Sequence, residues 1–261
     1  MRALQLCFTL LVSLFLLVPL LIVLPLAFTS GAFLAYPIPD LSLRWFDELV
    51  TSEIWRRALV NSLVIGAATA ALATLLGTTA ALGLRRSGAV SARVIGTVFL
   101  LPLVVPAVVL GVGLQRLLAE LGLSGSYLAV IIAHTVVAVP FVMISVSGAL
   151  ASVPAQAERA AASLGASPLT VLREVTLPLS RHGILTGAAL AFATSLDEVV
   201  LTMFVAGPRQ RTLSRQMFSS LRENISPTIA AAAFVFILLT LALGGLVLLA
   251  RRSRSLPAAE R

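Results

Sequence analysis

The sequence contains no lysine, because all 19 basic residues are arginine. A P-loop needs a lysine that reaches the β- and γ-phosphates of a nucleotide. The chain therefore has no P-loop, and any ATP that drives its function must be hydrolysed by another chain. A single cysteine, Cys7, excludes an intrachain disulfide. HExxH, CxxC and nucleophile-elbow patterns are also absent, so the sequence supports neither a metal site nor a set of catalytic residues.

Charged residues are scarce as well. They make up 11% of the 261 residues, whereas soluble domains carry roughly 25%. The hydrophobic fraction of 59% and the mean hydropathy of +1.03 are typical of an integral membrane protein. The net charge of +8 does not indicate nucleic-acid binding, since no aromatic residues are interleaved with the arginines to stack on bases. We interpret the arginines as anchors at the membrane lipid interface.

Long apolar runs define the expected fold class, an all-α bundle of six transmembrane helices in one membrane domain over residues 1–261. Each run is long enough to cross a bilayer; they cover about 6–28, 59–84, 94–115, 127–150, 183–206 and 227–250. The first run is longer than a signal-peptide core, so we expect an uncleaved helix. Six spans place both termini on one side, and the arginines at 85–86 and in "RRSR" at 251–254 favour the cytoplasmic side.

A polar segment at 151–182 separates the fourth and fifth runs. "AERAAASLG" contains good helix formers and ends at Gly165, which suits a helix C-cap. Ser167 followed by Pro168 is a helix start signal. We expect Pro178 to interrupt the chain before the fifth span. The segment therefore predicts a short helix-turn-helix at the membrane surface.

This segment resembles the EAA signature of permease subunits in binding-protein-dependent ABC importers. Six residues fall on that pattern in register: Ala160, Ala161, Gly165, Val175, Leu177 and Pro178. In the family this loop forms a coupling helix that docks in a groove of a cytoplasmic ATPase. The resemblance implies an ATPase-coupling surface formed by Glu158, Arg159, Ala160, Ala161, Gly165, Ala166, Ser167 and Pro178.

The match has one departure. Arg159 occupies the glutamate position of the signature, and the nearest acid is Glu158. One residue corresponds to a rotation of about 100° around a helix. Which of these two side chains contacts the ATPase stays open.

Two further stretches, "SLDEVVLTMFVAGP" and "ISPTIAAAA", are similar to the branch that includes spermidine/putrescine importers. That resemblance implies a bacterial inner-membrane subunit with no cofactor of its own. Its partners would be a second permease subunit, an ATPase dimer that binds ATP and Mg²⁺, and an extracytoplasmic solute-binding protein. An opine or an amino-acid derivative is an alternative solute, since Ala107 follows Pro106 where some polyamine permeases carry an acid.

Asp197 and Glu198 are adjacent acids inside the fifth apolar run. A charge at the bilayer centre costs roughly 2.5–3.5 kcal/mol on insertion scales and usually marks a substrate path. In a continuous helix the two side chains point about 100° apart. One is therefore expected to line a path for a cation such as a polyamine, and Glu198 is the better candidate for a structural role. The alternative is a purely structural pair, satisfied by Thr194, Ser195 or an arginine of a partner.

A different class, an ATP-independent secondary transporter or channel, is also compatible with a chain of this hydropathy. Such transporters often contain internal repeats, and none stands out here. His134 lies among apolar residues of the fourth run. We expect it to form hydrogen bonds between helices rather than to relay protons.

Overall fold

The computed structural model describes residues 2–223 and 225–252. Within these ranges the chain is helical, which confirms the all-α class, and its only β contact is an isolated bridge between Thr29 and Leu41. The helices are α1 (Arg2–Leu26), α2 (Arg44–Thr51), α3 (Glu53–Arg86), α4 (Ala89–Val104), α5 (Ala107–Glu120), α6 (Tyr127–Ala151), α7 (Ala155–Ser163), α8 (Pro168–Val171), the π-helical turn η1 (Leu172–Thr176), α9 (Leu177–Asp197), α10 (Val200–Val205), the 3-10 turn η2 (Pro208–Gln210), α11 (Leu213–Glu223) and α12 (Thr228–Arg252).

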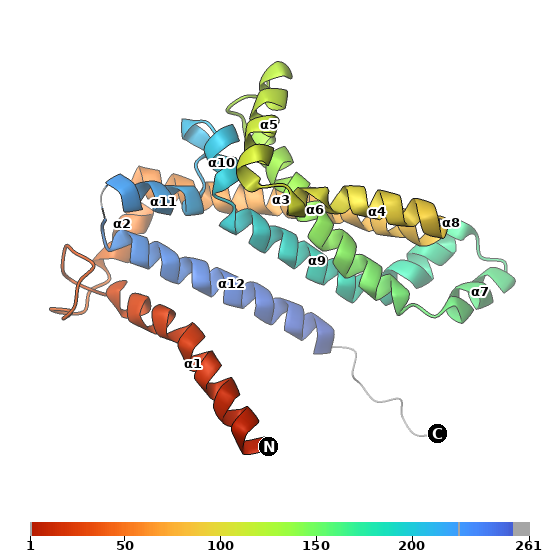
Figure 1. The fold of residues 1–261 in the computed structure, drawn as a ribbon, viewed down its shortest axis with the longest axis horizontal. Coiled ribbons are helices and arrows are strands. Elements are labelled where there is room, and N and C mark those ends of the chain that lie inside the picture. Colours follow the sequence, from red (N-terminus) through yellow and green to blue (C-terminus); the bar gives the residue numbers. More distant parts are fainter. Residues whose placement is uncertain (1, 224, 253–261) are drawn as a thin grey trace.

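Three long helices, α3, α6 and α9, form the centre of the bundle and lie side by side (Figure 1). Glycines allow their backbones to approach closely. A Cβ on Gly183 of α9 would overlap Ala149 of α6, and one on Gly77 of α3 would lie 2.6 Å from the Cβ of Val142. Small residues at helix crossings are the usual means of tight packing in lipid, where the hydrophobic effect does not drive helices together.

Four described helices are long and apolar enough to cross a membrane: α1, α3, α6 and α12. The expected third span, 94–115, falls on α4 and α5, which are bent by 102° and give a fifth span if counted together. Val105 between them is extended, with ψ of 130°. The following residue is Pro106, and the residue before a proline is disfavoured in the helical region.

The expected fifth span, 183–206, is not one continuous helix. It consists of the C-terminal part of α9 and the whole of α10. Glu198 and Val199 separate the two helices. Glu198 is extended, with ψ of 104°. The break leaves a helix that contains Arg181 and ends at Asp197, and α9 is not among the candidate spans of the described residues. This segment accounts for the difference from the six spans expected.

The shorter helices lie at the two ends of the bundle. α7 and α8 cover one end of α3, α6 and α9, and α2 and α11 lie near the other end of α3 (Figure 1). α1 diverges from the bundle, with most of its side chains exposed. It contacts α12 near Leu26 and Ala27, beside a cluster of three aromatic rings, Phe28, Phe46 and Phe234. Of the "RRSR" stretch, Ser253 and Arg254 lie outside the described residues.

Candidate functional site

The polar segment folds as the sequence predicts at its corner. α7 ends at Ser163, and Gly165 has a φ of +87°, the left-handed conformation that glycine adopts without strain. Ser167 caps α8 by accepting a hydrogen bond from the backbone N–H of Thr170 at 3.2 Å. A Cβ on Gly165 would meet nothing within 4 Å. Glycine is therefore required at position 165 by the positive φ, and not by a lack of room for a side chain.

Pro178 does not interrupt the chain, contrary to expectation. The helical backbone runs from α8 through η1 into α9, where Pro178 stands in the first turn. The N–H of Leu177 bonds to the carbonyl of Leu172, five residues back. This wider π-helical turn is followed by the first turn of α9, where a missing N–H is tolerated, so a proline fits there.

Glu158 on α7 forms an intramolecular link. Its carboxylate accepts hydrogen bonds from Nη1 and Nη2 of Arg85 at 2.8 and 3.0 Å. It accepts a third from Oγ1 of Thr176 at 2.6 Å. α7 is thus tied to the end of α3 and to η1. Burial raises the pKa of the Glu158 carboxyl, but the hydrogen bonds from Thr176 and Arg85 and the charges of Arg85 and Arg86 outweigh it, so the pKa is lowered overall.

The other residues of the expected coupling surface are at least partly exposed. Arg159, Ala160, Gly165 and Ser167 are exposed, and Ala161 and Ala166 are half-buried. None of the ion pairs among the described residues involves Arg159. Leu164, at the corner, is 90% exposed. Between this corner and α3 lies a pocket of about 410 Å³, lined by Leu82, Arg85, Arg86, Glu158, Ala162, Ala166, Pro168, Val171 and Thr176.

The two acids of the expected fifth span differ in environment. Asp197 is the last residue of α9 and is exposed, and among the described residues no hydrogen bond or ion pair holds its carboxylate. Glu198 is half-buried, and its Oε1 accepts the backbone N–H of Leu201 at 2.8 Å. This bond satisfies a free donor in the first turn of α10. The two acids diverge because the helix ends between them, and not because of the 100° rotation expected for a continuous helix.

His134 bridges the two sides of this break. Its Nδ1 lies 2.7 Å from Oγ of Ser195 on α9, and its Nε2 lies 2.9 Å from Oγ1 of Thr202 on α10. The ring is completely buried on α6. The hydrogen bonds between helices predicted for His134 are therefore confirmed. Ser195, named in the alternative of a structural pair as one partner for the acids, bonds to His134 instead.

A second group of polar residues lies near the start of α3, at the opposite end of that helix from Arg85. The side-chain N–H groups of buried Asn61 bond to the carbonyls of Arg209 and Arg211 at 2.8 and 2.9 Å. Tyr127 donates its hydroxyl to Oδ1 of Asn61 at 2.8 Å. These bonds hold the loop after α10 against α3.

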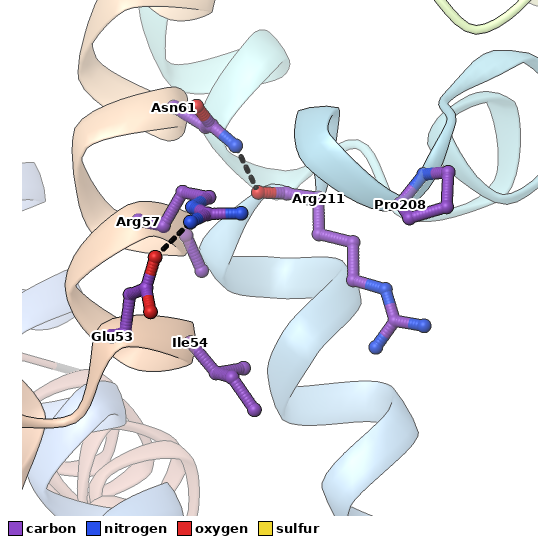
Figure 2. Close-up of a pocket in the computed structure, with 7 residues that line it drawn as sticks. Glu53, Ile54, Arg57, Asn61, Pro208 and Arg211 are labelled. Carbon is purple, nitrogen blue, oxygen red and sulfur yellow. Dashed lines mark hydrogen bonds and ion pairs between the residues drawn. The ribbon is translucent and has the colours of Figure 1, made fainter.

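Two adjoining pockets, of about 160 and 650 Å³, are lined by residues of α3 and this loop. Figure 2 shows the smaller one, with the Arg57 guanidinium turned toward Glu53 and the Arg211 side chain pointing away from that pair. Arg56, Arg209 and Arg211 form no ion pair with any described residue. The walls of the two pockets therefore carry an excess of positive charge.

Sequence reasoning did not find Arg85, Thr176 or Asn61. Each acts through a partner distant in the chain, 73 residues away for Arg85 and Glu158 and 18 for Thr176. The sequence feature that pointed toward Arg85 was the pair of arginines at the end of α3. We used this pair only to infer the side of the membrane on which the termini lie.

Comparison with known proteins gives the family. Residues 73–255 match the family described as "Binding-protein-dependent transport system inner membrane component". The chain is 37% identical over 236 residues to the molybdenum transport permease ModB of Mycobacterium tuberculosis, covering 83% of this chain and 89% of that protein. It is 36% identical over 200 residues to the putrescine transport permease PotI of Escherichia coli K12, covering 74% and 71%.

Solved structures agree on the fold. A chain of a bacterial importer of the polysaccharide alginate superposes with a TM-score of 0.73 at 18% identity, covering 97% of this chain and 94% of that one. A chain of the methionine transporter MetNI gives 0.61 at 19% identity, covering 78% and 99%. ATP is bound by a partner ATPase, and this permease subunit of an ABC importer has no catalytic role of its own. The chain belongs to the family of inner-membrane components of binding-protein-dependent transport systems.

Proposed function

We propose that this permease pairs with a second permease subunit to form the path of a cationic solute of the polyamine type. The exposed Asp197 carboxylate at the break between α9 and α10 is the observation that supports this most directly. A carboxylate without a partner inside a membrane segment is costly unless it faces water or binds a cation. The ammonium groups of putrescine or spermidine have the complementary charge. The likeness to putrescine and spermidine/putrescine permeases supports the same solute class.

We also propose how the chain couples to its ATPase dimer. The corner formed by α7, Gly165 and α8 docks in the ATPase, with exposed Leu164 and Arg159 as its contacts. Glu158 is already occupied by Arg85 and Thr176. The polar contact to the ATPase is therefore made by Arg159 with an acid on the ATPase, a reversal of the charge that the family signature leads one to expect. Glu158 instead stiffens the corner, so that movement of α7 reaches α3 and α9.

An oxyanion such as molybdate is the second candidate solute. Arg56, Arg57, Arg209 and Arg211 line the pockets at the far end of α3, where an anion entering from the outer side would meet an excess of positive charge. The similarity to a molybdenum permease points the same way. A dianion would then have to pass the exposed Asp197, which is why we rank this solute second.

The test is ATP-driven uptake into proteoliposomes that contain the complete importer with its second permease, ATPase and solute-binding protein. Labelled putrescine, spermidine and molybdate are compared, each with excess unlabelled competitor. Saturable uptake of a polyamine that molybdate does not inhibit supports the proposal. Molybdate uptake alone overturns the polyamine assignment, and uptake of neither, with ATP hydrolysis intact, directs the search to opines and amino-acid derivatives. Uptake that persists without the ATPase would indicate an ATP-independent transporter.

A further inference from the structure

The buried side chain of His134 has no role in the function described so far. It lies on α6 with no exposed surface, among apolar residues such as Val130, Ala133 and Val137. Both ring nitrogens nevertheless have hydrogen-bond partners, and those partners belong to the two helices on either side of the break. In surroundings without water, each unsatisfied polar group costs several kcal/mol. The two bonds of the ring therefore hold α9 and α10 to α6 strongly.

The direction of each hydrogen bond follows from the groups involved. Thr202 has one hydroxyl hydrogen, and its Oγ1 donates that hydrogen to the carbonyl of Glu198 at 2.8 Å. Toward His134 the same oxygen can only accept, so Nε2 carries the ring hydrogen. In a neutral ring Nδ1 is then the acceptor, and Ser195 donates to it. The bonds run in one direction, from Ser195 through His134 and Thr202 to the carbonyl of Glu198.

This chain of bonds ends at the residue where the helix is interrupted. It fixes the Glu198 carbonyl, while the Glu198 carboxylate caps α10 through the N–H of Leu201. At the other end of α10, Nη1 of Arg215 donates to the carbonyls of Thr202 and Ala206 at 3.2 and 3.0 Å. A negative group at the N-terminus and a positive one at the C-terminus both suit the helix dipole. α10 is therefore held as a separate short helix.

We propose that His134 is the positioning residue that maintains the break between α9 and α10 and thereby keeps the Asp197 carboxylate exposed to the solute path. The role of Asp197 rests on the proposed function, but the role of His134 in the break does not. Without the imidazole, Ser195 and Thr202 lose their common partner, and residues 195–202 are free to form hydrogen bonds within a continuous helix. In such a helix the residues after Asp197, the last residue of α9, would continue along the axis of α9 and change the surroundings of its carboxylate.

The first experiment measures the exposure of position 197 without reference to any solute. In a Cys7→Ser background, which removes the only native cysteine of this chain, Asp197→Cys is combined with His134→Leu, His134→Gln, Thr202→Val or Thr135→Val, and modification is measured on this chain. The assembled importer in membrane vesicles is treated with a water-soluble thiol reagent, and the rate of modification is measured. Gln provides amide N–H donors and a carbonyl acceptor in place of the two ring nitrogens. Thr135 is the matched control, because among the described residues its hydroxyl bonds only to the carbonyl of Ile131 in its own helix.

The modification rate is expected to fall at least fivefold in His134→Leu and Thr202→Val and to stay within twofold in His134→Gln and Thr135→Val. A rate within twofold in Thr202→Val, which keeps the shape of the side chain, overturns the proposal even if His134→Leu fails to assemble. An equal change in Thr135→Val also overturns it, since the effect would then be general loosening of α6.

The second experiment uses uptake kinetics with native Asp197. His134→Leu is expected to raise KM for the cation about as much as Asp197→Asn does, and the double variant is expected to be no worse than either. Additive losses would contradict a shared role. If no cation is transported, this arm tests the proposed function rather than His134, and the thiol arm still decides the role of the histidine.

Discussion

Substituting Glu158 tests whether α7 is held to the bundle as the structure shows. The carboxylate accepts two hydrogen bonds from Arg85 and one from Thr176, and the paired side chains of Arg85 and Glu158 are 30% and 25% exposed. Hydrogen bonds to charged groups contribute about 1.5–3 kcal/mol each when shielded, while exposed ion pairs contribute about 0.2–1 kcal/mol. For this partly exposed cluster we expect a total of about 1–2 kcal/mol.

Glu158→Ala removes all three bonds, so the free energy that opposes local opening of α7 should fall by that amount. Because 1.36 kcal/mol corresponds to tenfold, backbone amides of residues 155–163 should exchange hydrogen about 5 to 30 times faster. The assay is hydrogen exchange of the purified importer followed by mass spectrometry. Arg86→Gln is the comparison variant, because Arg86 lines the same pocket and acts on the Glu158 carboxylate through its charge but donates no hydrogen bond to it, so its effect on exchange should be smaller.

A double-mutant cycle with Arg85→Gln separates the pair from its surroundings. Arg85→Gln, Glu158→Gln and the double variant should show a coupling energy of about 1 kcal/mol. Exchange of residues 155–163 that stays within twofold of wild type in Glu158→Ala would refute the reasoning, since α7 would then be held by other contacts.

Gly183→Ala should destabilise the chain by about 1–3 kcal/mol, because its Cβ overlaps Ala149, while Gly148→Ala, which meets nothing within 4 Å, should not lower the Tm. Gly165→Ala and Gly165→Leu should weaken ATPase binding to a similar degree. Both side chains have a Cβ, and the positive φ at this position costs each of them about 1–2 kcal/mol. A much larger effect of Leu would instead indicate steric crowding by the longer side chain. Asn61→Ala should cost about 1–3 kcal/mol in thermal unfolding and Tyr127→Phe less, since Tyr127 contributes one of the three bonds of Asn61 and a longer contact of 3.4 Å with the carbonyl of Arg209. The Glu158 pKa is lowered from 4.5, so its stabilisation should be complete above about pH 5 and disappear as the pH falls through the lowered pKa, which exchange rates of α7 at graded pH would show.

The local features of the coupling segment were predictable because short-range chemistry determines them. A glycine after a helical run and a Ser-Pro pair specify one helix end and one helix start, and both occur where the sequence places them. Pro106 also indicates the bend between α4 and α5, because a proline disfavours a helical conformation in the residue before it. Spans assigned from continuous apolar runs alone do not include this bend.

The break after Asp197 could not be read from the sequence. "SLDEVVLT" contains no proline or glycine, and nothing in it prevents a continuous helix. The break is stabilised by side chains from other elements, His134 of α6 and Arg215 of α11. The role of Glu158 escaped prediction for the same reason, since its partner Arg85 ends a helix 73 residues earlier.

We propose that the Asp197 carboxylate lines a path for a cation. The most direct test is the initial rate of ATP-driven uptake of labelled putrescine and spermidine by the complete importer, with Asp197 as the native residue, Asn or Glu. We expect Asp197→Asn to reduce uptake at least tenfold while ATPase binding is unchanged, and Asp197→Glu to retain most of it. Equal polyamine uptake by the native and Asp197→Asn importers would contradict the claim and assign the carboxylate no part in the path.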